Sequence, residues 1–268
     1  MKTLIYFFSL FLVCISCSNS DVSDGGGNTP ELVFTIPMNT GNWWTYNVVG
    51  NGTTTRDSLY VSGDTLITPY TYKKFKAKNN LATGFYSSSL KNNAVRKENN
   101  TLFLTGSLTI NQLQALPISF VLDLQNFIIF KSSAATNETL STKTGSFQQT
   151  VNNNPLTIDY TLTSLGGESF ATFNSPNGTN YTDVKTTKIV LNLKITSTQI
   201  IAGLPFTITY LQPQDVMTST LYIAKNKGMV YSNTDTNYTV AQAVATQLGI
   251  PSTNTQNQKE YLHTYNVN

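Results

Sequence analysis

An unbroken alternation of apolar and polar residues decides the fold class, and it reads Leu156-Thr157-Ile158-Asp159-Tyr160-Thr161-Leu162-Thr163. Successive side chains of a β-strand point to opposite faces, so the pattern predicts a strand with one buried face and one solvated face. Antiparallel sheets commonly have this two-sided character, whereas parallel strands are usually apolar on both faces. The same period recurs, with Val190 as an exception, in the segments 118–124, 188–195 and 206–210.

Clusters of Gly and Asn separate the alternating segments and predict the turns of an antiparallel meander. Both residues accept a positive φ, which tight hairpin turns require. The expected turns lie at residues 50–52, 62–64, 78–80, 152–155, 177–178 and 226–228. The last of these joins two short apolar runs into a hairpin, and the polar stretch 132–144 is expected to be a long loop or an insertion. We therefore predict an all-β fold, an antiparallel β-meander that is barrel-like or a sandwich.

One segment near the C-terminus departs from the strand period. Val240, Val244 and Leu248 are spaced by four residues, which is typical of an amphipathic helix, and Gly249 follows as a stop signal. We predict one short helix near 239–248. A final strand after it would close the sheet and tie the two ends of the domain together.

The first seventeen residues carry a targeting signal. Lys2 precedes an apolar run from Leu4 to Ile15, then the small residue Ser16, then Cys17. The run is shorter than the about 20 residues that a spanning helix needs, and it suits the core of a signal peptide. The segment resembles bacterial lipoprotein signals, with Cys14 standing where the usual motif has leucine. The resemblance implies a signal peptide at 1–16 and lipidation of Cys17, and the alternative is an ordinary secretory signal that contains two cysteines.

The segment 17–30 is expected to be the lipidated cysteine and a flexible tether, because it contains nothing that can build a core. As a random coil it reaches about 20 Å. Ser18 differs from the aspartate of inner-membrane retention signals, and early Asp21 and Asp24 resemble the surface-export tethers of Bacteroidetes lipoproteins. The implied location is the outer membrane, lipid-anchored, with the cell surface as one option. Residues 31–268 are expected to form a single β-rich domain.

Short motifs in the domain resemble a group of Bacteroidetes outer-membrane lipoproteins of unknown function. The motifs are Gly-Asn-x-Trp-x-Tyr at 41–46, Gly-Asp-Thr at 63–65 and Ala-x-x-x-Gly-x-Val at 224–230. The resemblance implies a β-meander or half-barrel domain. It carries no catalytic residue to this chain.

Composition narrows the set of partners and cofactors. Charged residues make up 12% of the chain, the formal net charge is +3, and the only arginines are Arg56 and Arg96. No basic stripe with interleaved aromatic residues appears, so no nucleic acid is expected as a partner. After Cys17 the chain has no cysteine, and its one histidine, His263, is expected to be a packed or surface residue on the last strand. We therefore predict no disulfide, no metal site and no cofactor.

No catalytic residues are predicted. The fourteen acidic residues are spread singly, the segment 165–169 is not a Gly-x-Ser-x-Gly elbow, and no phosphate-binding loop follows a strand. A hydrolase acting through carboxylates that meet only in the fold remains an alternative.

Two sets of residues are candidates for binding or modification. Trp43 and Trp44 are adjacent, so one should enter the core and the other should face outward. An outward tryptophan with Tyr46 could stack on sugar rings, and the alternative is a cover for the rim of the core. Ser58 and Thr65 lie in Asp-Ser-Leu and Asp-Thr-Leu sequences, which resemble bacterial O-glycosylation signals. For Asp64, beside Thr65, the alternative is a turn residue.

These observations predict a lipid-anchored cell-envelope protein that is a non-catalytic binding or structural module. A curved sheet can enclose an apolar groove, so an amphipathic or lipid ligand is the first expectation. A surface glycan-binding module that uses exposed aromatic residues is the alternative. An internal apolar cavity would favour lipid, an exposed aromatic row would favour glycan, and two carboxylates across a cleft would favour an enzyme.

Overall fold

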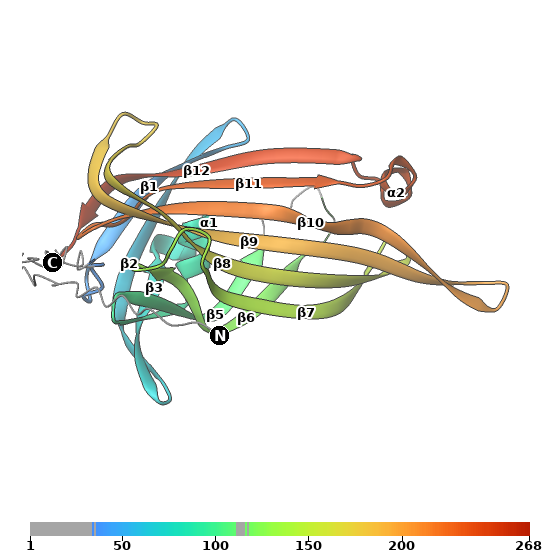
Figure 1. The fold of residues 1–268 in the computed structure, drawn as a ribbon, viewed down its shortest axis with the longest axis horizontal. Helices are drawn as coiled ribbons and strands as arrows, with labels where there is room; N and C mark the ends of the chain where they lie inside the picture. Colours follow the sequence, from blue (N-terminus) through green and yellow to red (C-terminus); the bar gives the residue numbers. More distant parts are fainter. Residues whose placement is uncertain (1–33, 35, 111–115, 117) are drawn as a thin grey trace, which may run out of the picture. The chain divides into compact units, whose positions relative to one another are not determined.

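The computed structural model describes residues 34, 36–110, 116 and 118–268. The predicted signal peptide, Cys17 and the tether lie outside these residues. The described part of the chain forms one antiparallel sheet of twelve strands (Figure 1). The strands are β1 Trp43–Gly50, β2 Thr53–Ile67, β3 Tyr70–Ala77, β4 Ala94–Glu98, β5 Thr101–Ile110, β6 Phe120–Lys131, β7 Thr139–Val151, β8 Asn154–Asn174, β9 Asn180–Ile201, β10 Leu204–Ala224, β11 Gly228–Thr239 and β12 Thr253–Asn266.

The strand order shows how the sheet curls. It runs β6-β5-β4-β3-β2-β1-β12-β11-β10-β9-β8-β7. Apart from β6 and β7, strands that follow one another in the chain are neighbours in the sheet, and β12 joins the two halves by pairing with β1. The two end strands, β6 and β7, are consecutive in the chain and contact each other. The sheet therefore bends into a nearly closed, barrel-like form. This confirms the predicted all-β class. The last strand ties the two ends of the domain together as expected, but it lies in the middle of the sheet and does not close it.

The strands are longer than the sequence pattern indicated. The predicted segments 156–163, 188–195 and 206–210 lie inside β8, β9 and β10, and the segment 118–124 overlaps β6, which begins at Phe120. The strands β8 and β10 have 21 residues each and β9 has 22. Irregular pairing, such as the bulge between Gly166 and Ser169 opposite β9, lets a strand continue where its alternation is interrupted.

Two expectations about loops are wrong. The stretch 132–144 is not one long loop, because β7 begins at Thr139; β7 ends one side of the sheet and is mostly exposed, so its polar residues give no alternation. Residues 62–64 are not a turn either. The strand β2 passes through them with a bulge at Gly63 (φ 152°), and the chain reverses after Ile67.

Two short α-helices occur in the described residues. The helix α2, Gln242–Leu248, confirms the predicted helix near the C-terminus, and Gly249 ends it with φ 68°. The helix α1, Phe85–Leu90, was not predicted, because Phe-Tyr-Ser-Ser-Ser-Leu has no helical period of apolar residues. Phe85 and Leu90 of α1 pack against apolar residues of β5, β6, β8, β9 and β10, so α1 lies on the inner face of the sheet.

Candidate functional site

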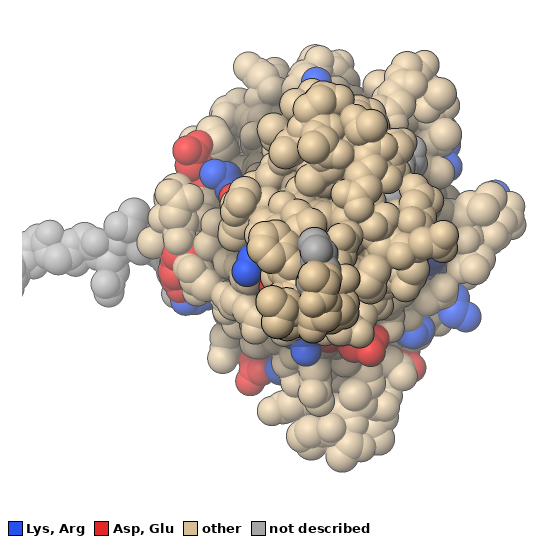
Figure 2. All heavy atoms as spheres, turned by 90° about the vertical axis from the view of Figure 1, so that its right-hand side faces the viewer, with Lys and Arg blue, Asp and Glu red and all other residues tan. Residues whose placement is uncertain are grey.

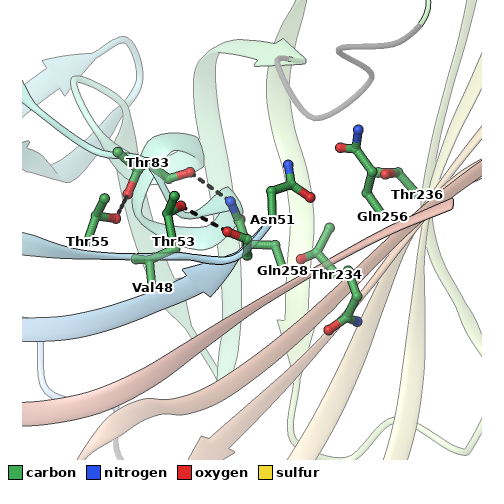
Figure 3. Close-up of a pocket in the computed structure, with 11 residues that line it drawn as sticks. Val48, Asn51, Thr53, Thr55, Thr83, Thr234, Thr236, Gln256 and Gln258 are labelled. Atoms are coloured by element: carbon green, nitrogen blue, oxygen red, sulfur yellow. Dashed lines mark hydrogen bonds between the residues drawn. The ribbon is translucent and has the colours of Figure 1, made fainter. Parts of the chain in front are cut away.

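A polar pocket opens beside α1 on the inner face of the sheet, with a volume of about 340 Å³ (Figure 3). We call it the threonine–glutamine pocket. Its walls come from β1, β2, β11, β12, the turn between β1 and β2, and the chain just before α1. The lining residues are Val48, Gly50, Asn51, Thr53, Thr55, Thr83, Thr234, Thr236, Gln256, Asn257 and Gln258.

Strand period and register place the main polar side chains opposite one another. Thr234 pairs with Gln258, and Thr236 pairs with Gln256. Residues two apart on a strand share a face, so this polar row continues along β12 to the buried Glu260. The inner face of β11 and β12 is therefore polar at the pocket, whereas much of the inner face elsewhere is apolar.

Hydrogen bonds fix the wall that Thr83 contributes. The hydroxyls of Thr55 and Thr83 lie 2.6 Å apart, and Gln258 Nε2 donates to the Thr83 carbonyl at 3.0 Å. Gln258 Oε1 accepts from the Phe85 backbone amide at 2.8 Å. One glutamine of the pocket thus binds the segment that leads into α1, and it does not move freely.

Two buried carboxylates accept hydrogen bonds from residues 83–87, next to the pocket wall. Asp57 of β2 accepts from the Thr83 amide at 2.9 Å, from the Thr83 hydroxyl at 3.0 Å and from the Gly84 amide at 2.8 Å. Glu260 of β12 accepts from the Tyr86 amide at 2.6 Å and from the Ser87 hydroxyl at 2.8 Å. The free amides at a helix start have no partner within the helix, so these carboxylates replace water there.

Burial dominates the electrostatics of Glu260. Removal from water raises the pKa of its carboxyl to about 7, although hydrogen bonds from Ser87 and the Tyr86 amide favour the charged form and lower it. The charge of Asp57 also acts to raise it. Neither carboxylate lines the pocket, and both are bound to backbone amides of residues 83–87. Asp57 and Glu260 therefore face α1, and they support the pocket wall through these hydrogen bonds.

The pocket offers hydroxyl and amide groups and no ionisable side chain. Such groups donate and accept hydrogen bonds without a fixed charge. In the described part of the chain, no group of three or more His, Cys, Asp or Glu could hold a metal ion. The chemistry available here suits a neutral ligand rich in hydroxyl groups.

The structure separates the three aromatic residues proposed for ligand stacking. Trp43 is 36% exposed, whereas Trp44 is 3% and Tyr46 is 0% exposed. The expectation that the two tryptophans face opposite ways is confirmed. Trp44 and Tyr46 are wrong as stacking residues, because they pack in the core and donate to the carbonyls of Lys227 and Met229. Trp43 starts β1, and the pocket lies at the other end of that strand.

The two candidate modification sites lie on β2. Ser58 and Thr65 are both half-buried. Asp57, which precedes Ser58, holds the pocket wall, so its place in the sequence has a structural reason. Modification of either hydroxyl stays a prediction.

An aromatic row crosses the sheet on β8, β10, β11 and β12. Its members are Phe170, Phe173, Tyr222, Tyr231 and Tyr261. The rings of Phe173 and Tyr222 stack with centroids 4.3 Å apart and an angle of 22° between planes. The rings pack against one another in stacked and tilted pairs, so the row links the end of β8 to β10, β11 and β12.

The apolar cavities that the described residues line beside α1 are small. Two apolar cavities beside α1, one reaching Trp44 and the other Leu162, have volumes of about 30 Å³ each. Ligand pockets for small molecules usually measure about 300–1,000 Å³. These two cavities are gaps in a packed core, and the threonine–glutamine pocket is larger than either of them.

Sequence reasoning missed the pocket. The signal was present, because Thr234, Thr236, Gln256 and Gln258 are polar at positions that share a face with buried residues. Only the register of β11 against β12 shows that these four side chains meet.

Together, the fold and the pocket define an all-β domain with a neutral polar pocket. No family model matches this chain, and no curated protein matches it. Among solved structures, the chain is similar to a "putative lipoprotein" from Parabacteroides distasonis ATCC 8503, whose crystal structure was determined at 2.70 Å resolution. The identity is 10%, the match covers 87% of this chain and 98% of that chain, and the TM-score is 0.39. We transfer no residue and no activity from that protein.

In the part of the chain that the structure describes, no helix is long and apolar enough to cross a membrane.

Proposed function

We propose that this chain is a lipid-anchored cell-envelope protein whose domain binds a neutral glycan in the threonine–glutamine pocket, without catalysis. The observation that carries the proposal is the pocket itself, about 340 Å³ of space lined by hydroxyls and amides with no charged side chain. A neutral glycan presents many hydroxyl groups and no charge. These hydroxyls can donate hydrogen bonds to, and accept them from, the hydroxyl and amide groups that line the pocket.

The proposal favours glycan over lipid as the ligand. The apolar cavities inside the sheet measure about 30 Å³ each, so an acyl chain would have to displace core side chains. The anchoring part rests on the sequence from Lys2 to Cys17. The outer membrane and the cell surface are the locations that the tether sequence favours.

Removing a pocket amide should weaken glycan binding. We expect Gln256→Ala to lower the affinity for a neutral oligosaccharide by about 3- to 10-fold, the value of one or two hydrogen bonds. The measurement is saturation-transfer NMR followed by calorimetry, with neutral oligosaccharides of glucose, mannose and N-acetylglucosamine as probes.

A matched control is Gln212→Ala, which removes an exposed glutamine on β10 that does not line the pocket. This variant should bind as the parent protein does. Equal losses in both variants, or binding that neither change affects, would place the glycan elsewhere on the protein.

Anchoring has its own test. Intact mass spectrometry of the membrane-extracted protein should give the mass of residues 17–268 plus acyl chains, because several chains on one residue hold a protein stably at a membrane. A Cys17→Ala variant should be unprocessed or released. An unmodified soluble protein cut at another residue would contradict the anchor and leave the pocket proposal standing.

A further inference from the structure

The hairpin of β9 and β10 projects beyond its neighbours in the sheet. The pairing of β8 with β9 reaches Thr196 of β9, and the pairing of β11 with β10 begins at Met217 of β10. Beyond these points β9 and β10 pair only with each other and close through a turn at Ala202 and Gly203. This ribbon forms the far right of Figure 1.

The end of the ribbon exposes large apolar side chains. Leu204 is 71% exposed, Ile200 is 69% exposed and Phe206 is 59% exposed. Single exposed apolar residues are common on proteins, but three within seven residues of one projecting hairpin form a patch. We call Ile200, Leu204 and Phe206 the hairpin tip.

The apolar side chains of the hairpin tip lie on both faces of the ribbon. Residues that pair directly across two strands share a face, and Ile200 pairs with Pro205. Leu204 and Phe206, one residue to either side of Pro205, point to the opposite face. A folded protein partner would cover one face of a ribbon. A bilayer surrounds an inserted ribbon, and therefore contacts both faces.

The charge pattern also fits a hydrocarbon environment. No Asp, Glu, Lys, Arg or His occurs from Ile195 to Gln214. Figure 2 looks onto this end of the molecule and shows uncharged residues over most of the centre, with charged residues mostly toward the outline. Because burying a charge in lipid is costly, a ribbon without ionisable side chains can enter at low cost.

The backbone limits how deep the ribbon can go. Where β9 and β10 pair only with each other, each strand has one edge whose backbone amides and carbonyls face no other strand, and these groups need water. Pro205 has no amide hydrogen, which removes one donor close to the turn. The depth that this allows is shallow, with the tip at the boundary of headgroups and acyl chains.

We propose that the hairpin tip inserts into the surface of a lipid bilayer, as a membrane contact separate from the N-terminal anchor. The occupant is the acyl region of a lipid leaflet, recognised by apolar contact on both faces of the ribbon. The proposal does not depend on the glycan pocket, which is formed by β1, β2, β11 and β12.

The test measures depth, so the N-terminal anchor does not confound it. A nitroxide spin label is placed on Ile200→Cys in the full processed protein on phosphatidylcholine vesicles, and its accessibility to oxygen and to a water-soluble nickel complex is measured. We expect high oxygen and low nickel accessibility. The signal should be insensitive to salt, because no charge takes part.

A second pair of variants separates insertion from other contacts. Leu204→Ser with Phe206→Ser should return the label to water, whereas the matched control Leu66→Ser, at a residue that is 70% exposed on β2, should leave its depth unchanged. A label that stays in water in the parent protein overturns the proposal. So does a label that becomes shielded without vesicles as the protein associates, because the tip would then contact a second copy.

Discussion

Glu260→Ala should lower the free energy of unfolding by about 3 kcal/mol, because it leaves several buried donors without an acceptor. The Tyr86 and Ser87 amides and the Ser87 and Ser232 hydroxyls all donate to this carboxylate, and Glu260 is 0% exposed. No water replaces it without opening the core. The measurement is chemical denaturation monitored by tryptophan fluorescence at pH 4.5.

The control for this change is Asp123→Ala, which removes an exposed acidic residue from β6. We expect a change within about 1 kcal/mol there, since exposed polar contacts contribute little. If Glu260→Ala is equally mild, the carboxylate does not hold α1 in place.

Glu260 also gives the stability of the protein a pH dependence of known sign. Its pKa is about 7 in the folded protein and about 4.5 when unfolded, so folding takes up a proton between these values. The contribution of Glu260 to the free energy of unfolding is therefore fully present below pH 4.5 and is lost as the pH rises to about 7. The loss is about 3 kcal/mol, since one pKa unit corresponds to about 1.4 kcal/mol.

Glu260→Gln tests this assignment, because glutamine keeps an acceptor oxygen and cannot ionise. Its unfolding free energy, compared with that of the parent protein from pH 4.5 to above pH 7, should fall less steeply. Other titrating groups act equally in both proteins. Parallel curves would mean that Glu260 does not change its protonation in this range.

Gly84→Ala should destabilise the protein by about 2–3 kcal/mol through a steric clash with the same carboxylate. A Cβ atom at Gly84 would lie 2.1 Å from Glu260 Cδ and 2.2 Å from Oε2. The backbone of Gly84 has φ −72° and ψ 150°, which any residue adopts, so the cost is one of space and not of conformation. The loss of stability is measured by the same denaturation experiment.

A double variant gives the sharper result. The three atoms nearest to the added Cβ all belong to the Glu260 side chain, so Gly84→Ala should cost much less when Glu260→Ala is already present. Gly50→Ala is the matched control, because a Cβ atom there would have its nearest contact at 3.4 Å, and the nearest atoms belong to Asn257 and Gln258 rather than to Glu260. Additive losses at Gly84 and Glu260 would show that the two residues do not meet.

Much of the fold could be predicted because strand period is a local property. The alternating segment 156–163 lies in the strand β8, and the Asn-Lys-Gly turn at 226–228 joins β10 and β11 in a hairpin. The prediction of a loop at 132–144 was wrong, because the polar residues there gave no sign of a strand. The strand β7 ends the sheet and buries little, so its threonines and serines carry no apolar signal.

The candidate site could be predicted much less well. Trp44 and Tyr46 are aromatic residues near the start of the domain, and their type alone does not tell a sugar platform from a core. The structure buries both, and it forms its polar pocket from threonine and glutamine residues that no motif marks.

The sequence by itself determined the all-β class, the antiparallel pairing of neighbours, the helix near 239–248 and the separation of Trp43 from Trp44, because each depends on residues within one turn or strand. Only the tertiary structure decided that β12 lies between β1 and β11, that Asp57 binds the chain before α1 while Glu260 binds its first turn, and that four polar side chains of β11 and β12 meet in a pocket. These are contacts between residues far apart in the chain. They depend on register and on curvature of the whole sheet, which no local pattern encodes.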